Sequence, residues 1–443
     1  MIKNALSGLQ SLFTNPVLRK KIIYTLVGLA IYRLLVIIPV PFVNIDSLMS
    51  QTQQAADGLG NFLMLFGWSL DNFSIVAVGL GPFINASIII QLLTVVIPHF
   101  EELQEMGEQW SKQLQIYMRY ITFPLAFVQS IGMVFFINSL IGGLIDTSSW
   151  TTVLFAAFIM AVGSMIILFL ADLITEKGIT NGTSLIIFAS IIAGVTTQLF
   201  SSFAAVSGIS GFVSMFLFIA IIFGGLVLLS IFILKSLKEI PVIYARQGKI
   251  QETSKLPIPL NPVGMIPIIF AMAFISFPYI VAQLVTKFGY PSDFVRYWAG
   301  WVELNFNIYT QQPSVYAIVA FFLLVVFFTY FYTLVTFNPD KIADNIQKRG
   351  GFVPGIRPGN ETAQYIKGVI NHLSLWWGAG LWFLGIFTYV LHYIPLVQDF
   401  ATQVWSIPVI ISGSGIIIIV GVIQQVMDKV QTEVLMSKYD TTE

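Results

Sequence analysis

The sequence predicts an all-α polytopic membrane protein with ten transmembrane helices, and three observations support this prediction. Ten apolar stretches are each about long enough to cross a bilayer, which takes roughly 20 mainly apolar residues. Hydrophobic residues make up 56% of the chain and charged residues only 10%, whereas a soluble domain is typically about 25% charged. Positive charge lies almost entirely on alternate connections between the stretches. Most of this protein is therefore expected to face lipid.

The expected spans follow one another along the whole chain. They are 22–42, 77–97, 114–137, 151–173, 183–200, 211–234, 263–285, 314–336, 372–394 and 405–427. All basic residues except Arg33, Lys287 and Arg296 lie before the first span, after the second, fourth, sixth and eighth spans, or in the tail, with Arg119 counted at the entry of the third span. The positive-inside rule places these segments, and both termini, in the cytoplasm. Residues 1–21 are weakly amphipathic, which fits either an interfacial helix or ordinary helix packing.

Composition argues against several classes of function. The chain has no cysteine, which excludes disulfides and cysteine metal sites. Its three histidines lie at span edges without an obvious serine or aspartate partner, so we expect no enzyme, no cofactor and no metal site. A secondary transporter, the remote alternative, would place ionisable residues near the membrane midplane. Only Arg33 lies well inside a span.

The region 58–81 is neither a loop nor a full span. It is apolar and rich in glycine, and Asp71 and Asn72 interrupt it. A broken helix cannot face lipid, because its backbone polar groups would be unpaired. Two interpretations stay open: a re-entrant plug inside the protein, or an amphipathic loop on the outer surface.

The helix expected after this region is apolar but carries polar residues. They are Asn85, Ser87, Gln91 and Thr94. Such residues commonly hold membrane helices together, and the alternative is a seam that opens. Ile84 and Ile88 lie one turn apart on a shared face. A second interruption, the turn at 174–184, restarts a helix on which Thr183 and Ile187 share a face.

Two long connections lie on the basic side. The first, 235–262, carries five basic residues, two acidic ones and four prolines, which favour an extended or hairpin backbone over helix. The second, 337–370, suits a short helix after Asn338-Pro339 and then a rigid turn with Arg357 at its tip. Positive-inside bias alone would explain the charge but not the proline and glycine. We favour a platform on which a partner docks.

Together these segments resemble the SecY family, the pore subunit of the Sec protein-translocation channel. The motifs that carry the resemblance are Pro82–Thr94, Ile174–Gly182, Leu260–Pro267, Thr329–Tyr332, Asn338-Pro339, Ala343–Asn345, 352–359 and Val430–Thr432. They occur in order over nearly the whole chain, and the turn at 352–359 is highly specific.

The resemblance implies two inverted five-helix halves with a re-entrant plug at about 58–76. The corresponding segments are 1–21 (N-terminal segment), 22–200 (first half), 201–234 (start of the second half), 235–262 (basic loop), 263–336 (spans seven and eight), 337–370 (basic loop), 371–427 (spans nine and ten) and 428–443 (tail). The implied pore ring is Ile84, Ile88, Thr183, Ile187, Ile269 and Ile418. The implied lateral gate opens between spans two and three and spans seven and eight, with Ser87, Gln91, Thr94 and Asn261.

The implied function is a protein-conducting channel. It passes unfolded secretory polypeptides with signal sequences across the bacterial cytoplasmic membrane and releases signal or transmembrane helices sideways into lipid. Because the chain has no nucleotide-binding loop, a SecA-type motor ATPase or a ribosome supplies the energy, and nucleic acid is met only through the ribosome. SecE-like and SecG-like small membrane subunits are the other implied partners. The implied docking residues are Arg357, Lys235, Lys238, Arg246, Lys249, Lys348 and Arg349.

Several segments depart from the family pattern. Thr183 stands at a ring position that is usually aliphatic, which predicts a slightly leakier seal. Residues 101–112 are acidic where many members carry a Gly-Arg-Arg-Lys run, and the tail lacks the usual basic extension. The ninth span carries Trp376, Trp377 and Trp382. These departures leave open an accessory Sec channel dedicated to a few substrates.

Overall fold

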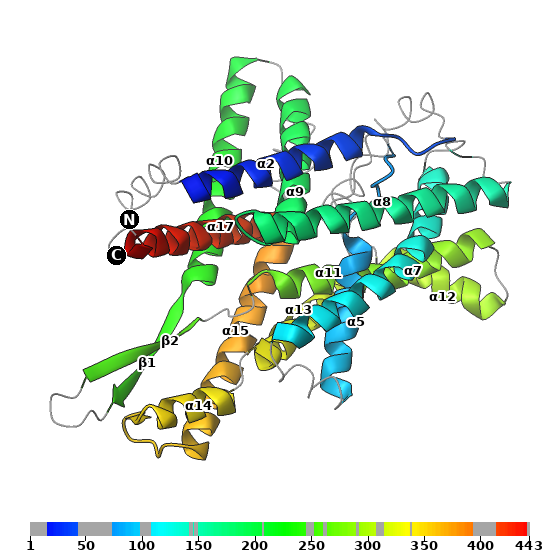
Figure 1. Cartoon of the computed structure of the whole chain (residues 1–443). Helices are drawn as coiled ribbons and strands as arrows, with labels where there is room; N and C mark the ends of the chain where they lie inside the picture. Colours follow the sequence, from blue (N-terminus) through cyan, green and yellow to red (C-terminus); the bar gives the residue numbers. More distant parts are fainter. Residues whose placement is uncertain are drawn as a thin grey trace.

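The structure is a computed structural model of the chain, and it is almost entirely helical (Figure 1). It describes residues 16–42, 73–97, 108–140, 145, 149–205, 208–244, 252–259, 264–288, 292–306, 314–336, 339–392 and 413–440. Each expected span overlaps one long helix. These helices are α2 (Pro16–Ile37), α5 (Gly81–Val96), α7 (Glu108–Leu140), α8 (Trp150–Lys177), α9 (Gly182–Ala205), α10 (Ile209–Lys235), α11 (Ile266–Phe288), α13 (Val315–Thr336), α15 (Asn360–His392) and α17 (Gly413–Asp440).

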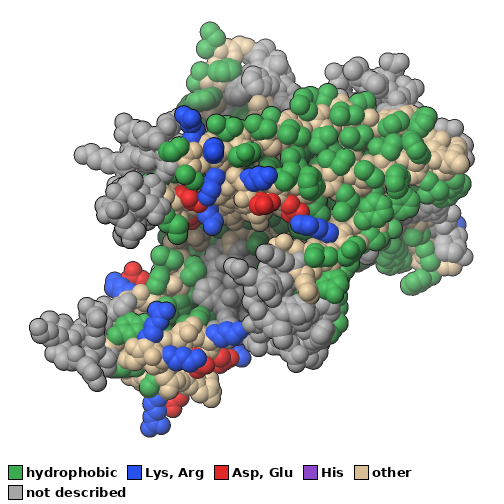
Figure 2. All heavy atoms as spheres, viewed as in Figure 1, with side chains coloured by type: hydrophobic (Ala, Val, Ile, Leu, Met, Phe, Trp, Pro, Cys, Tyr) green, Lys and Arg blue, Asp and Glu red, His purple; other side chains and the backbone are tan. Residues whose placement is uncertain are grey.

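The helices are those of a multi-pass membrane protein. Among the described residues, six helical stretches are long and apolar enough to cross a membrane, and three shorter apolar helical stretches accompany them. Hydrophobic side chains cover most of the face seen in Figure 2, and the charged side chains gather toward the left of that view. Large apolar side chains such as Leu34, Phe169 and Leu228 are exposed on the long helices, as lipid-facing residues should be.

A small antiparallel sheet lies at one end of the molecule (Figure 1). It consists of β1 (Leu237–Tyr244), β2 (Glu252–Pro259) and β3 (Gly351–Phe352), in the order β2-β1-β3. The hairpin expected within 235–262 is thus present, with Leu237 opposite Pro259 and Tyr244 opposite Glu252. The second basic loop joins the first, because Ile243 of β1 pairs with Phe352 of β3.

The helical part of the second loop is also as expected, but one boundary differs. The short helix α14 (Pro339–Lys348) follows Asn338-Pro339. The ninth long helix, α15, begins at Asn360, well before the expected span. Its first turns carry Ile366 and Ile370, which pack against Ile240 and Val353 in a separate small apolar core. Because this face is buried, α15 begins before the apolar span and continues into it.

Residues 73–80, which lead into α5, lie inside the protein. The N–H of Val40 donates to the carbonyl of Phe73 at 3.0 Å, and the N–H of Ile75 donates to the carbonyl of Ile38 at 3.0 Å. Phe73 is fully buried. This placement fits the interior alternative for the end of the 58–81 region, while 58–72 lies outside the described residues.

Replacing Gly163 with alanine is expected to destabilise this packing. A Cβ at Gly163 of α8 would lie 1.9 Å from the carbonyl oxygen of Ile75, so backbone must move. Overpacking of this kind costs about 1–3 kcal/mol. Thermal unfolding of the purified protein in detergent should show a lower midpoint for Gly163→Ala. Gly224→Ala, on α10 with open space around its Cβ, is the control and should not lower the midpoint.

Candidate functional site

An apolar collar lies where four helices meet. Ile84 and Ile88 of α5, Ile187 of α9 and Ile418 of α17 are all buried in one large hydrophobic cluster. Ile269 of α11 is partly buried and packs against the same cluster. These five of the six residues that the resemblance assigns to a ring all carry aliphatic side chains and belong to, or pack against, the same apolar core.

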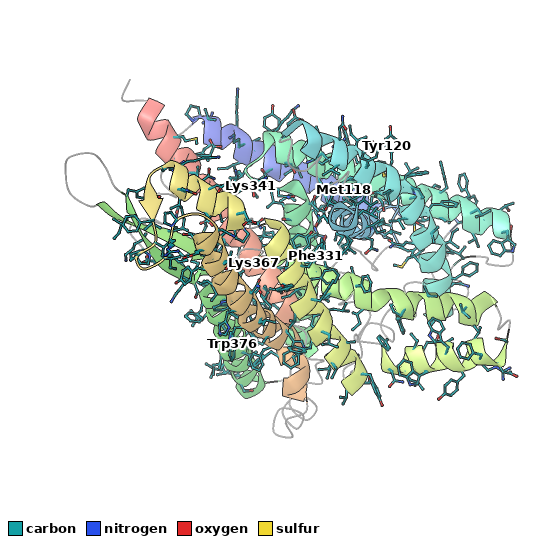
Figure 3. All side chains as sticks on the ribbon, turned by 90° about the horizontal axis from the view of Figure 1, so that it is seen from below. Met118, Tyr120, Phe331, Lys341, Lys367 and Trp376 are labelled. Atoms are coloured by element: carbon teal, nitrogen blue, oxygen red, sulfur yellow. The ribbon has the colours of Figure 1, made fainter. Side chains whose placement is uncertain are left out.

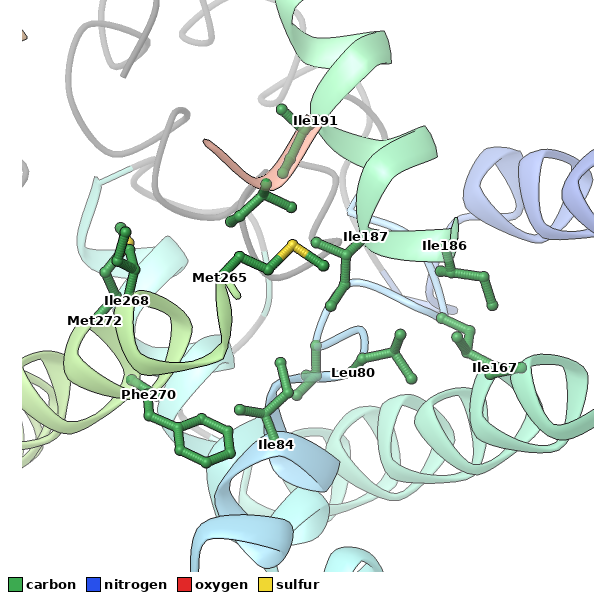
Figure 4. Packing of buried hydrophobic residues seen from close by; sticks show 14 of the residues in the cluster. Leu80, Ile84, Ile167, Ile186, Ile187, Ile191, Met265, Ile268, Phe270 and Met272 are labelled. Carbon is green, nitrogen blue, oxygen red and sulfur yellow. The ribbon is translucent and has the colours of Figure 1, made fainter. Parts of the chain in front are cut away.

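Thr183, the sixth expected ring residue, is polar and so does not count among the hydrophobic side chains of this cluster. It lies half-buried in the first turn of α9, where its N–H donates to Oδ1 of Asn181 at 2.9 Å. Ile191, one turn beyond Ile187, is buried in the cluster instead. Figure 4 shows Ile187 and Ile191 on the same side of α9, facing the side chains of α5 and α11. Residues four apart share a helix face, so Thr183 with Ile187 and Ile187 with Ile191 fit this spacing equally well. The sequence pattern alone could not show which pair lines the collar.

Met265 is a second residue that the sequence reasoning missed. It precedes α11, is buried in the same cluster, and points toward Ile187 in Figure 4. A Cβ on Gly421 of α17 would lie 3.1 Å from the Met265 sulfur. The glycine therefore lets this flexible side chain lie directly against α17, which brings α11 and α17 together at the collar. Methionine adapts to irregular space more readily than a branched side chain.

The polar residues of α5 do not all hold neighbouring helices. The hydroxyl of Ser87 donates to the carbonyl of Ile84 at 2.7 Å, and that of Thr94 donates to the carbonyl of Gln91 at 2.7 Å. Both hydroxyls are thus satisfied within α5, and separating α5 from a neighbour would leave these two bonds intact. Oε1 of Gln91 is buried without a hydrogen-bond partner among the described residues. Asn261, the fourth expected gate residue, lies outside the described residues.

The helices beside this seam form two pairs. α5 contacts α7, and α11 contacts α13. Aromatic rings join the second pair: Phe270 of α11 lies 5.9 Å from Phe328 and 5.1 Å from Tyr332 of α13, between ring centroids. α11 also contacts α5 and α7, so the two pairs touch along a seam. Such an arrangement can part between the pairs while each pair stays together.

Two side chains of α2 bind the N-terminal half of α9. Nη2 of Arg33 donates to the carbonyl of Ala189 at 2.9 Å, and the Tyr32 hydroxyl lies 2.5 Å from Oγ of Ser190. Arg33, the ionisable residue well inside an expected span, is therefore bound to a backbone carbonyl of α9. This contact positions a helix of the collar and gives no support to ion-coupled transport.

The two basic loops form one platform, built from the sheet, α14 and the start of α15. Its core includes Ile240, Val242 and Ile346. Figure 3 labels Lys341 of α14 and Lys367 of α15, one on each of the two helices of this platform. Of the expected docking residues, Lys235, Lys238, Lys348 and Arg349 are exposed, as their side chains must be to meet a partner. Arg246 and Lys249 lie outside the described residues.

Arg357 lies at the tip of a turn on this platform. Its side chain is 86% exposed, and Nη1 lies 3.7 Å from Oε1 of Glu361. Gly355 and Gly359 on either side have φ of +80° and +99°, a backbone conformation that favours glycine. The Thr362 hydroxyl donates to the carbonyl of Arg357 at 2.8 Å. The backbone is thus fixed while the guanidinium projects into solvent.

The described residues hold no group of three or more His, Asp or Glu side chains that could bind a metal ion. The collar consists of apolar side chains that can neither donate nor accept a proton. The arrangement can exclude water and ions or yield to a passing chain, and it offers no acid, base or nucleophile.

Comparison with known proteins identifies the family. The SecY family model matches residues 74–427. "Protein translocase subunit SecY" of Staphylococcus carnosus is 34% identical over 441 residues, which cover 96% of this chain and 97% of the relative. The protein of the same name from Halalkalibacterium halodurans is 35% identical, with coverage of 97% and 98%.

Solved structures share the fold. One described as "The structure of a protein conducting channel" matches with a TM-score of 0.60 at 18% identity, covering 94% of this chain and 92% of that chain. Sec61 in the canine ribosome-channel complex from the endoplasmic reticulum matches with the same values. The family model covers most of the chain and the relatives match it over nearly their full length, so the chain belongs to the SecY family.

Proposed function

We propose that this chain is a protein-conducting channel whose apolar collar is the constriction through which unfolded polypeptide passes. The observation that supports the proposal is that Ile84, Ile88, Ile187 and Ile418, from three helices, are all buried in one apolar cluster, against which Ile269 of a fourth helix packs. An apolar constriction is poorly wetted, so ions meet a barrier there. Aliphatic side chains can still move apart for an extended chain. Ile191, buried one turn beyond Ile187, is proposed to line the constriction together with Ile187.

The seam between α5 and α11 is the proposed lateral gate. Two features support it: the Ser87 and Thr94 hydroxyls bond within α5, and aromatic rings join α11 to α13. A signal or transmembrane helix is apolar, so its free energy falls when it moves from water into lipid. Parting of the seam gives such a helix a path into the bilayer.

The platform of the sheet, α14 and α15 is the proposed docking site for the energy source. Its exposed basic side chains suit a SecA-type motor ATPase or a ribosome. The positive-inside rule puts this platform and both termini in the cytoplasm, with the chain in the bacterial cell membrane. SecE-like and SecG-like subunits are proposed to cover part of the exposed apolar helices. The relatives are named translocase subunits, and no observation favours an accessory channel.

Reconstitution tests the proposed function. The purified chain, in proteoliposomes with small subunits and a motor that co-purify with it, should protect a secretory precursor from added protease in the presence of ATP. Mass spectrometry of the co-purified motor would distinguish a housekeeping from an accessory channel. A precursor that stays fully digestible in proteoliposomes holding the intact complex would contradict the proposal.

A further inference from the structure

The short helix α12 (Asp293–Asn305) lies in the connection between α11 and α13. It is far from the β-sheet in Figure 1, at the opposite end of the molecule. Oγ of Ser292 caps its start by accepting from the N–H of Val295 at 3.4 Å. At its other end the Ser314 hydroxyl donates to the carbonyl of Asn305 at 2.5 Å. α12 is therefore fixed to the beginning of α13.

One side of α12 packs on the protein. Ala299 and Val302 are buried and form a small cluster with Ala282 of α11. Val285 and Phe306 pack against the same cluster. These contacts account for the buried side of the helix and tie it to the end of α11.

The opposite side carries a stripe of large apolar side chains, which we call the α12 stripe. Its members are Phe294, Tyr297, Trp301 and Leu304, spaced three or four residues apart so that they share one face. Phe294, Tyr297 and Leu304 are 77%, 75% and 81% exposed. Contiguous apolar surface of this kind marks a protein or membrane contact.

A third side of α12 is polar. It carries Arg296 and Glu303, and Nη2 of Arg296 lies 3.9 Å from Oδ1 of Asp293. Around its axis the helix therefore presents a protein-facing side, a polar side and an apolar side. This is the pattern of a helix at the boundary between protein, water and lipid.

The α12 stripe continues onto a membrane span. The ring centroid of Trp301 lies 5.9 Å from that of Tyr316, in the first turn of α13. Val319 and Leu323 continue the exposed apolar side along α13, whose residues 315–333 are long and apolar enough to cross a membrane. Tryptophan and tyrosine are enriched where spans meet the headgroup layer. The stripe therefore lies level with the end of a span.

We propose that α12 is an interfacial lipid anchor, with its stripe inserted at the headgroup–acyl boundary of the leaflet opposite the β-sheet. Asp293, Arg296 and Glu303 leave the helix without an excess of positive charge, so the anchor is held by apolar burial and does not require anionic lipid. Because α12 links α11 to α13, it fixes the ends of both helices at the lipid boundary. This proposal goes beyond the polypeptide route and does not depend on it.

Site-directed spin labelling tests the anchor. The chain contains no cysteine, so a single introduced cysteine carries the only label. Tyr297→Cys and Leu304→Cys place labels on the stripe, and Arg296→Cys places the matched control on the polar side of the same helix. None of the three touches the buried contacts of Ala299 and Val302. The full-length protein is reconstituted in phosphatidylcholine vesicles, and collisions with oxygen and with a water-soluble nickel chelate are measured.

At positions 297 and 304 oxygen accessibility should exceed nickel accessibility, and the order should reverse at position 296. Adding anionic lipid or salt should leave these orders unchanged. If the nickel chelate reached positions 297 and 304 as readily as position 296, the stripe would face water. Exclusion of both reagents from 297 and 304 would show that another subunit or a second copy covers it. Either result would overturn the proposal.

Discussion

Changing Arg357 to glutamate should reduce motor-driven export by about thirtyfold or more while the channel still inserts into the membrane. The carbonyl of Arg357 accepts a hydrogen bond from the Thr362 hydroxyl, and its side chain projects 86% exposed from the platform. An arginine at the centre of an interface contributes about 2 kcal/mol or more, and about 1.4 kcal/mol corresponds to a tenfold change in affinity. Charge reversal also adds repulsion against an acidic partner surface. The measurement is ATP-dependent protection of a precursor in proteoliposomes.

Arg296→Glu provides the matched control for this change. It reverses the same charge on an exposed helix at the other end of the molecule, far from the platform. Export should stay near the wild-type level in this variant. Undiminished export by Arg357→Glu at equal membrane abundance would count against the docking role of the platform.

Replacing Ile187 with asparagine should make the resting channel leak ions. Ile187 is buried in the collar between α5, α9 and α11. An amide that can hydrogen-bond water recovers about 1–3 kcal/mol relative to an unpaired polar group. When that energy favours wetting of the constriction, the leak rises about five- to 150-fold. Conductance of purified channels in planar bilayers measures the effect.

Two controls separate the collar from its surroundings. Ile187→Leu keeps the apolar volume and should stay sealed, because such swaps are well tolerated. Thr183→Ile should leave the leak unchanged, since Thr183 lies only half-buried in the first turn of α9, one turn before Ile187. The opposite result would be a lower leak in Thr183→Ile and an unchanged leak in Ile187→Asn. That result would show that the seal lies at the level of Thr183.

The long helices could be predicted from the sequence because a membrane span needs a long apolar run with few charges. The run at 211–234 became α10 and that at 151–173 lies within α8. The helix ends were less predictable. α15 begins at Asn360 because the partly polar turns around Ile366 pack on the platform. Hydropathy alone does not register such tertiary burial.

Within the collar, periodicity predicted which faces of α5 and α9 matter but not the depth along α9. Thr183, Ile187 and Ile191 all lie on one face, and only the tertiary structure shows that Ile187 and Ile191 are buried while Thr183 is half-buried. Met265 lies before the first turn of α11, where no helical period applies. Gly421 of α17 leaves room for the Met265 sulfur, and only the structure shows this contact.

The joining of the two basic loops could not be read from the sequence. β3 has only two residues, too few for a strand pattern, and its partner lies more than a hundred positions earlier. The sequence likewise predicts no separate element at α12, because this helix lies in the connection between two expected spans. Its stripe has helical spacing, but recognising it required the buried contacts on the opposite side of the helix.

Crosslinking inside the collar tests the central claim most directly. A photoreactive residue is placed at Ile88 or Ile187, and a precursor fused to a tightly folded domain is arrested in transit. We expect both positions to crosslink to the arrested chain, while Phe169, exposed on the apolar surface of α8, captures only lipid or membrane subunits. Arrested precursor that never crosslinks to position 88 or 187, although it is protected from protease, would show that the polypeptide takes another route.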